Sequence, residues 1–107
     1  MNSFEIHNKA KNEIKSIIIR DETNEDNEID MDILPTKTVG YLKSKIEEKF
    51  TLKVGTLKNI HLRMQKKGER VGTLLENDND TLFDYRIQTG AVVTFMVMEN
   101  IGGKLLF

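Results

Sequence analysis

The feature that most constrains the fold is a change in the spacing of apolar residues before the middle of the chain. Residues 29–33 alternate strictly between apolar and acidic side chains, which is the pattern of a half-buried strand. Pro35 then ends the strand because proline cannot donate to a ladder, and Thr38 is a good helix cap. The apolar side chains that follow have helical spacing, and they are Val39, Leu42, Ile46 and Phe50.

The flanking segments read as further strands. Residues 17–19 form a β-branched run, which predicts a hairpin with residues 29–33 through an acidic loop of about seven or eight residues. After the helix, residues 60–64 alternate again, and a short strand is expected around residues 71–75. Residues 92–98 are apolar on both faces, which is typical of a central strand.

A single helical turn is expected just before the last strand. Thr81 and Asp84 have the spacing of a capping box, in which each residue binds the other's backbone amide. The complete order is strand, strand, helix, strand, short strand, helical turn and strand. This order predicts an α+β domain in which one main helix packs across a mixed sheet of four to five strands.

One domain accounts for a chain of 107 residues. We expect a flexible N-terminal extension at residues 1–13, the folded domain at residues 14–103, and a C-terminal tail at residues 104–107. The predicted core residues are Ile17, Ile19, Ile29, Met31, Ile33, Val39, Leu42, Ile46, Leu62, Met64, Leu82, Ile87, Val93, Phe95 and Val97.

Composition argues against most catalytic and metal-binding chemistry. The chain has no cysteine, which excludes disulfides, thiolate zinc sites and cysteine nucleophiles. Neither His7 nor His61 belongs to a recognisable catalytic group, and the acidic segment lacks the spacing of a calcium loop. No run approaches the roughly 18 apolar residues of a membrane helix. We therefore expect a protein that is not an enzyme, with no cofactor, no metal and no membrane partner.

Charge is distributed unevenly although the net charge is only -1. Every charged residue in segment 21–32 is acidic, whereas basic residues dominate segment 43–70. Such runs are usually solvated faces. The alternative is a bipolar surface that orients a partner.

Several stretches resemble the ubiquitin superfamily in letters as well as in order. Residues 38–49 read Thr-Val-Gly-Tyr-Leu-Lys-Ser-Lys-Ile-Glu-Glu-Lys, and residues 81–88 read Thr-Leu-Phe-Asp-Tyr-Arg-Ile-Gln. Leu-Glu-Asn-Asp at residues 75–78 and a late Gly-Gly pair are similar too. The resemblance implies the β-grasp fold. It also implies that Tyr85 ties the helical turn to a neighbouring loop and that Lys43 helps hold the helix to the body.

The resemblance further implies a docking surface on the exposed face of the third and fifth strands. The outward positions there are predicted to be His61, Arg63, Thr94 and Met96, which we take as the protein-binding residues. Arg63 stands where ubiquitin has a central aliphatic residue, so a partner with an acidic rim around a small contact for Met96 is favoured. The plainer alternative is that these are ordinary solvated strand residues.

Three functions are compatible with these observations. The favoured one is a protein–protein interaction domain of a ubiquitin-pathway adaptor, ligase or shuttle protein, monomeric and located in the cytoplasm or nucleus. A second is a conjugated modifier processed at Gly102 and Gly103, which we disfavour because four residues follow the pair. A third is the RNA-binding ubiquitin-like domain of a splicing factor, disfavoured because the tail holds only one lysine.

Overall fold

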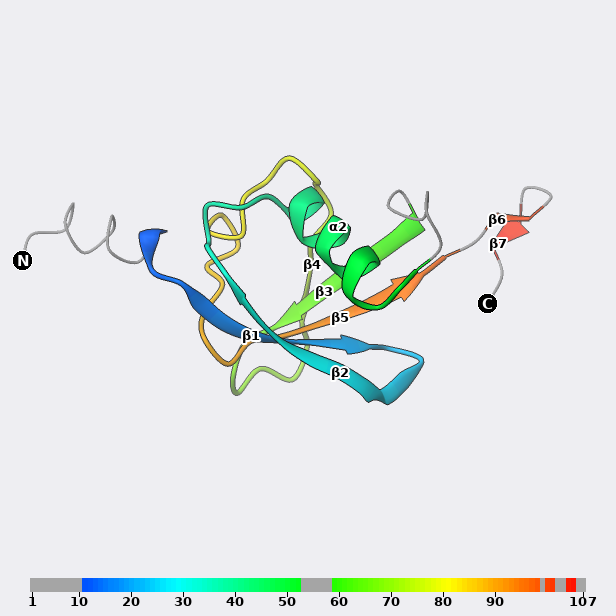
Figure 1. Cartoon of the computed structure of the whole chain (residues 1–107), viewed down its shortest axis with the longest axis horizontal. Coiled ribbons are helices and arrows are strands. Elements are labelled where there is room, and N and C mark those ends of the chain that lie inside the picture. Colours follow the sequence, from blue (N-terminus) through cyan, green and yellow to red (C-terminus); the bar gives the residue numbers. More distant parts are fainter. Residues whose placement is uncertain (1–10, 53–58, 99, 102–103, 106–107) are drawn as a thin grey trace, which may run out of the picture.

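The computed structural model describes residues 11–52, 59–98, 100–101 and 104–105 (Figure 1). Most of the predicted extension and part of the predicted tail lie outside these ranges. The elements are β1 (Lys15–Asp21), β2 (Asn24–Ile33), α2 (Val39–Lys49), β3 (Ile60–Gln65), β4 (Thr73–Leu74), β5 (Val92–Val97), β6 (Asn100–Ile101) and β7 (Lys104–Leu105).

Five of these strands form one mixed sheet in the order β2-β1-β5-β3-β4. β5 runs parallel to β1, and the other neighbouring pairs are antiparallel. α2 crosses one face of the sheet (Figure 1). The α+β architecture and the central position of β5 are therefore confirmed, while β4 is shorter than the predicted segment.

The predicted long acidic loop is wrong. β2 already begins at Asn24, and the β1–β2 ladder extends to the pair Asp21 and Asn24. The turn is tightened by the Asp21 carboxylate, which accepts hydrogen bonds from the Thr23 amide at 2.9 Å and hydroxyl at 2.7 Å. Most of the acidic run thus lies on an edge strand, because pairing with β1 overrides the low strand propensity of its residues. Charged side chains at an edge also discourage pairing with other chains.

α2 begins and ends as the sequence predicts. Thr38 Oγ1 accepts a hydrogen bond from the Tyr41 amide at 3.1 Å, and Phe50 is the C-cap residue. Gly40 lies in the first turn, where its amide donates to the Asp78 carbonyl at 2.9 Å. A side chain at this position would lie 3.3 Å from the same oxygen, so the close approach of the 76–80 loop explains the glycine.

The core lies between α2 and the sheet and matches most of the prediction. Ile29, Met31 and Val97 are only partly buried, and they pack against the cluster from its margins. Three core residues escaped the sequence prediction, namely Ile60, Leu75 and Ala91. The rings of Phe50 and Phe95 meet edge to face at 4.6 Å, which joins the end of α2 to the central strand.

The helical turn predicted before the last strand is a hydrogen-bonded turn at residues 81–86 rather than a helix, and the predicted capping box stabilises it. The Thr81 amide donates to the Asp84 carboxylate at 2.9 Å, and the Asp84 amide donates to Thr81 Oγ1 at 3.2 Å. These bonds to the Thr81 backbone and side chain hold the pKa of Asp84 below its ordinary value. Tyr85 Oη donates to Asp80 Oδ2 at 3.0 Å, so the tyrosine ties the turn to the preceding loop as expected.

Candidate protein-interaction surface

The face of the sheet turned away from α2, here named the outer face, carries a row of side chains across all five strands. Cross-strand register places them in the order Glu28, Arg20, Thr94, Arg63 and Leu74. On the three central strands, the neighbours Ile19, Leu62, Met64, Val93 and Phe95 point into the core, since successive residues of a strand face opposite sides. The outer face is therefore a rigid array whose side chains are set by ladder pairing.

The four predicted binding residues meet on this face. Met96 is directly opposite His61, and Thr94 is directly opposite Arg63. His61 and Arg63 are exposed, while Thr94 and Met96 are half-buried. A shallow cavity of about 280 Å³ opens here, and its lining consists of Glu22, His61, Leu62, Arg63, Leu74, Met96 and Met98.

The two arginines of the row differ in their electrostatic state. Arg20 Nε lies 2.9 Å from Glu28 Oε2, so its charge is paired. Among the described residues, no carboxylate forms an ion pair with Arg63. A partner that covered Arg63 without a carboxylate would therefore bury an unpaired charge.

Gly72 gives the Arg63 side chain its position. A methyl group on Gly72 would lie 2.6 Å from Arg63 Cγ and 2.8 Å from the Met64 carbonyl oxygen. The aliphatic stem of Arg63 therefore lies across the glycine backbone. Holding the stem in this way reduces the conformational entropy that the side chain loses on binding.

Sequence reasoning missed three contributors to this face. Arg20 and Glu28 form their pair only because of the hairpin register. Leu74 falls in a predicted strand, and the structure shows it 47% exposed and opposite Arg63 in the ladder. The available signal was the alternation of β1 and β2, which places Arg20 and Glu28 on the polar side.

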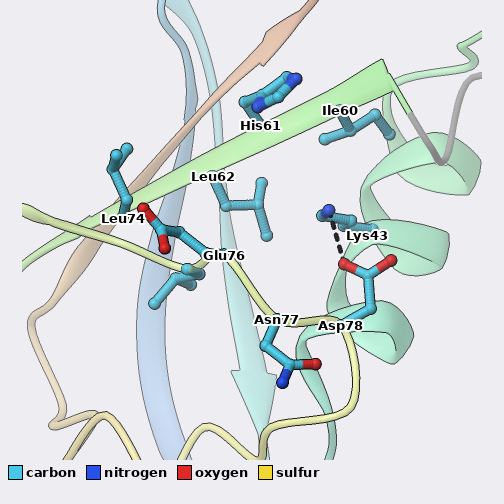
Figure 2. Close-up of a pocket in the computed structure, with 9 residues that line it drawn as sticks. Lys43, Ile60, His61, Leu62, Leu74, Glu76, Asn77 and Asp78 are labelled. Atoms are coloured by element: carbon cyan, nitrogen blue, oxygen red, sulfur yellow. Dashed lines mark hydrogen bonds and ion pairs between the residues drawn. The ribbon is translucent and has the colours of Figure 1, made fainter.

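A second groove, of about 660 Å³, lies between β3 and the loop after β4 (Figure 2). Lys43 reaches into it from α2, and its Nζ lies 2.6 Å from Asp78 Oδ1. Lys43 is only 7% exposed, whereas the Asp78 side chain is half-exposed. The predicted role of Lys43 in holding the helix is confirmed. Since its charge is neutralised within the domain, this groove offers less for recognition than the outer face.

Three other predictions concern a metal site, a membrane span and the Gly-Gly processing pair. In the part of the chain that the structure describes, no group of three or more His, Asp or Glu side chains is arranged to hold a metal ion. None of the helices in that part has the length and apolar character needed to span a membrane. Gly102 and Gly103, the predicted processing pair, lie outside the described residues.

Comparison with known proteins agrees with the fold. A family model described as a ubiquitin-like domain matches residues 14–97. No curated protein matches the chain by sequence. The C-terminal ubiquitin-like domain of mouse tubulin-specific chaperone e is similar, with a TM-score of 0.73, 14% identity, and coverage of 86% of this chain and 94% of that one.

Two further structures show the same architecture. The ubiquitin-like domain of tubulin-binding cofactor B has a TM-score of 0.66 and 14% identity, with 79% of this chain and 90% of that one covered. Ubiquitin of Caldiarchaeum subterraneum has a TM-score of 0.59 and 19% identity, with 85% and 100% covered. Ubiquitin-like domains typically mediate protein–protein interactions and are non-catalytic. With the family model spanning most of its length, this chain belongs to the ubiquitin-like domain family.

Proposed function

We propose that this ubiquitin-like domain binds protein partners non-covalently through the outer face, around Arg63 and Met96. The observation that carries the proposal is the arrangement of Arg63. This arginine is exposed, without an ion pair among the described residues, and held across Gly72 beside a shallow cavity. A preorganised cation next to a small apolar contact is suited to recognition, since little entropy is lost on binding.

The chemistry of the face defines which partners fit. Met96 and Leu74 supply a small apolar contact, His61 and Arg63 surround it with polar and cationic groups, and Glu22 lines the same cavity. A partner with a carboxylate beside an apolar side chain would pair with the cationic group and also cover the apolar contact. Receptors built for a purely apolar patch should bind weakly, because burying Arg63 unpaired costs several kcal/mol.

We place the domain in an adaptor, ligase or shuttle protein of the ubiquitin pathway, acting as a monomer in the cytoplasm or nucleus. The family membership and the position of the predicted surface support this placement. Because two of the similar structures come from proteins named for tubulin, tubulin is a second partner to be tested beside ubiquitin-pathway proteins.

The test is a chemical-shift titration of the labelled chain with purified ubiquitin-pathway receptors and, separately, with tubulin. We expect perturbed amides at His61, Arg63, Thr94 and Met96, and we expect Arg63→Glu to weaken the interaction at least about tenfold. Lys49→Glu, on the exposed end of α2, is the matched control and should bind normally. Shifts confined to α2 or β2, or an Arg63→Glu protein that binds like the parent, would overturn the proposal.

A further inference from the structure

We propose that the β3–β4 hairpin extends the outer face into a site for an acidic, apolar-containing segment of another protein. This inference rests on the proposed function, because it specifies the chemistry of the partner on that same surface. The residues that carry it are here named the basic rim, and they are Arg63, Lys66, Lys67 and Arg70.

The basic rim concentrates positive charge, and none of its side chains forms an ion pair within the described residues. Within the described ranges the ion pairs join Arg20 to Glu28, Lys43 to Asp78, and Lys45 to Glu48, so no rim side chain takes part in one. The single acid in the turn is Glu69, and its carboxylate accepts a hydrogen bond from the Lys66 amide at 3.0 Å. Four cations thus share the hairpin with one structurally engaged carboxylate.

Exposed apolar side chains accompany this charge. Val71 is 78% exposed and Leu74 is 47% exposed, and both lie on the hairpin. Leu74 is also directly opposite Arg63 in the β3–β4 ladder. A ligand that covers Leu74 therefore meets the Arg63 guanidinium as well. Leaving such apolar area in water is unfavourable, so its burial would add to the electrostatic attraction.

The hairpin is held in one shape before any ligand arrives. The Gln65 side-chain amide donates to the Arg70 carbonyl at 3.2 Å and also to the Glu69 carbonyl. The Glu69 amide donates to the Lys66 carbonyl at 3.0 Å, and Gly68 supplies the left-handed backbone with φ of 88°. These bonds fix the backbone from which the basic rim projects, which lowers the entropic cost of binding.

The sheet also favours one orientation of an acidic ligand. β2 and β4 are the two edges of the sheet, and β2 carries exposed acidic side chains at Glu25, Asp26, Glu28, Asp30 and Asp32. An acidic segment is attracted to the basic rim and repelled by β2. Electrostatic complementarity of this kind contributes mainly to the rate and register of association.

A protein segment fits this hairpin better than a nucleic acid does. Single-stranded nucleic acids are held by basic grooves that also offer aromatic rings for base stacking. The exposed apolar residues of this hairpin are aliphatic. The acidic β2 strand on the same sheet would also repel a long phosphate backbone.

The experiment uses the full chain and a labelled synthetic peptide in which glutamates surround two separated leucines. We expect amide shifts over residues 61–74 and an affinity that falls with added salt. Reversing the rim with Lys67→Glu and Arg70→Glu should weaken binding at least about tenfold. Reversing Lys11 and Lys49 together makes the same charge change elsewhere and should have little effect. Val71→Ser should weaken binding of the leucine-containing peptide about fivefold. The same variant should bind polyglutamate, which has no leucine, as well as the parent does.

Each contrary result has its own meaning. Equal binding by the rim-reversed and control-reversed proteins would overturn the inference, as would tighter binding of a single-stranded oligonucleotide in competition. Salt-sensitive self-association, with the β2 strand of a second copy on the rim, would overturn it in favour of a homotypic contact. If Arg63→Glu abolishes binding of a native partner and rim reversal does not, the inference fails while the proposed function stands. Peptide-induced shifts confined to residues far from β3 and β5 would contradict both the inference and the proposed function.

Discussion

The inner and outer faces of the sheet are formed by alternating residues of the same strands, but the inner face is packed and the outer face is open to solvent. On the inner face, Ile19, Phe95 and Leu62 are buried under α2. On the outer face, Arg20, Thr94 and Arg63 lie one position away along β1, β5 and β3 and remain accessible to solvent. A single backbone therefore holds a packed core and an open polar array at the same time.

This contrast shows where the domain is free to vary. Inner-face side chains are constrained by close packing, in which even a methylene is felt. Outer-face side chains are placed by the same ladder but are exposed or only half-buried, so contacts such as that of the Arg63 stem with Gly72 constrain them less. An arginine at position 63 is therefore compatible with the fold, and its effect should appear in binding rather than in stability. The following predictions test this division from the largest expected change to the smallest.

The largest effect should come from the inner face at Ile46. This side chain is fully buried between α2 and the sheet, so Ile46→Ala should lower the free energy of unfolding by about 2–5 kcal/mol. Urea unfolding and thermal melting, both monitored by circular dichroism, measure the change. A variant that melts within about a degree or two of the parent would show that the core is wrongly assigned.

A smaller loss of stability is expected at the ion pair between α2 and the 76–80 loop, and its size should depend on which partner is replaced. Asp78→Ala leaves the buried Lys43 ammonium without its partner, which should cost about 1–3 kcal/mol. Lys43→Met removes the charge and keeps an apolar stem, while Asp78 remains half-exposed to water. This second change should cost less than about 1 kcal/mol. Equal losses in the two variants, measured by urea unfolding, would contradict this account.

Local sequence signals were sufficient for the elements whose side chains alternate between core and solvent. The cap at Thr38, the helix after it and the strand at residues 60–64 all follow from spacing. The β1–β2 hairpin was predicted from the same signals, but its length was not, because its far end is polar on both sides. There, strand formation depends on pairing with a distant segment, and local propensity indicates a loop instead.

The candidate surface was predictable only in part for the same reason. Alternation and the family resemblance locate His61, Arg63, Thr94 and Met96. The pairing of Arg20 with Glu28 and the approach of Arg63 to Gly72 depend on register between strands far apart in sequence. A shift of one residue in either ladder would reverse the face to which these side chains point.

Ionisation of Tyr85 should make the stability of the domain depend on pH in the alkaline range, and the outer face should be unaffected. Burial, followed by its hydrogen bond to Asp80, raises the pKa of Tyr85 above its ordinary value. The folded chain therefore retains this proton longer than the unfolded chain. Its contribution to stability is fully present below about pH 10 and is lost as the pH rises through the raised pKa.

Tyr85→Phe should remove this alkaline loss and should leave the amide shifts of residues 61–65 unchanged. Urea unfolding between neutral pH and about pH 11 measures the dependence. A parent protein whose stability is flat across that interval would contradict the role of burial and of the Asp80 hydrogen bond.

The smallest change in stability should come from the outer face at Arg63. This side chain is exposed and forms no ion pair among the described residues, so Arg63→Glu should alter the free energy of unfolding by no more than about 0.5 kcal/mol. Thr94 opposite it is uncharged, so the new carboxylate meets no like charge across the ladder. Partner binding should nevertheless fall at least about tenfold, because the reversed charge repels the carboxylate that the arginine attracts. Parallel urea unfolding and shift titrations of one sample separate the two effects. A large loss of stability would mean that Arg63 belongs to the packed structure after all, and the division between the two faces would not hold at its central residue.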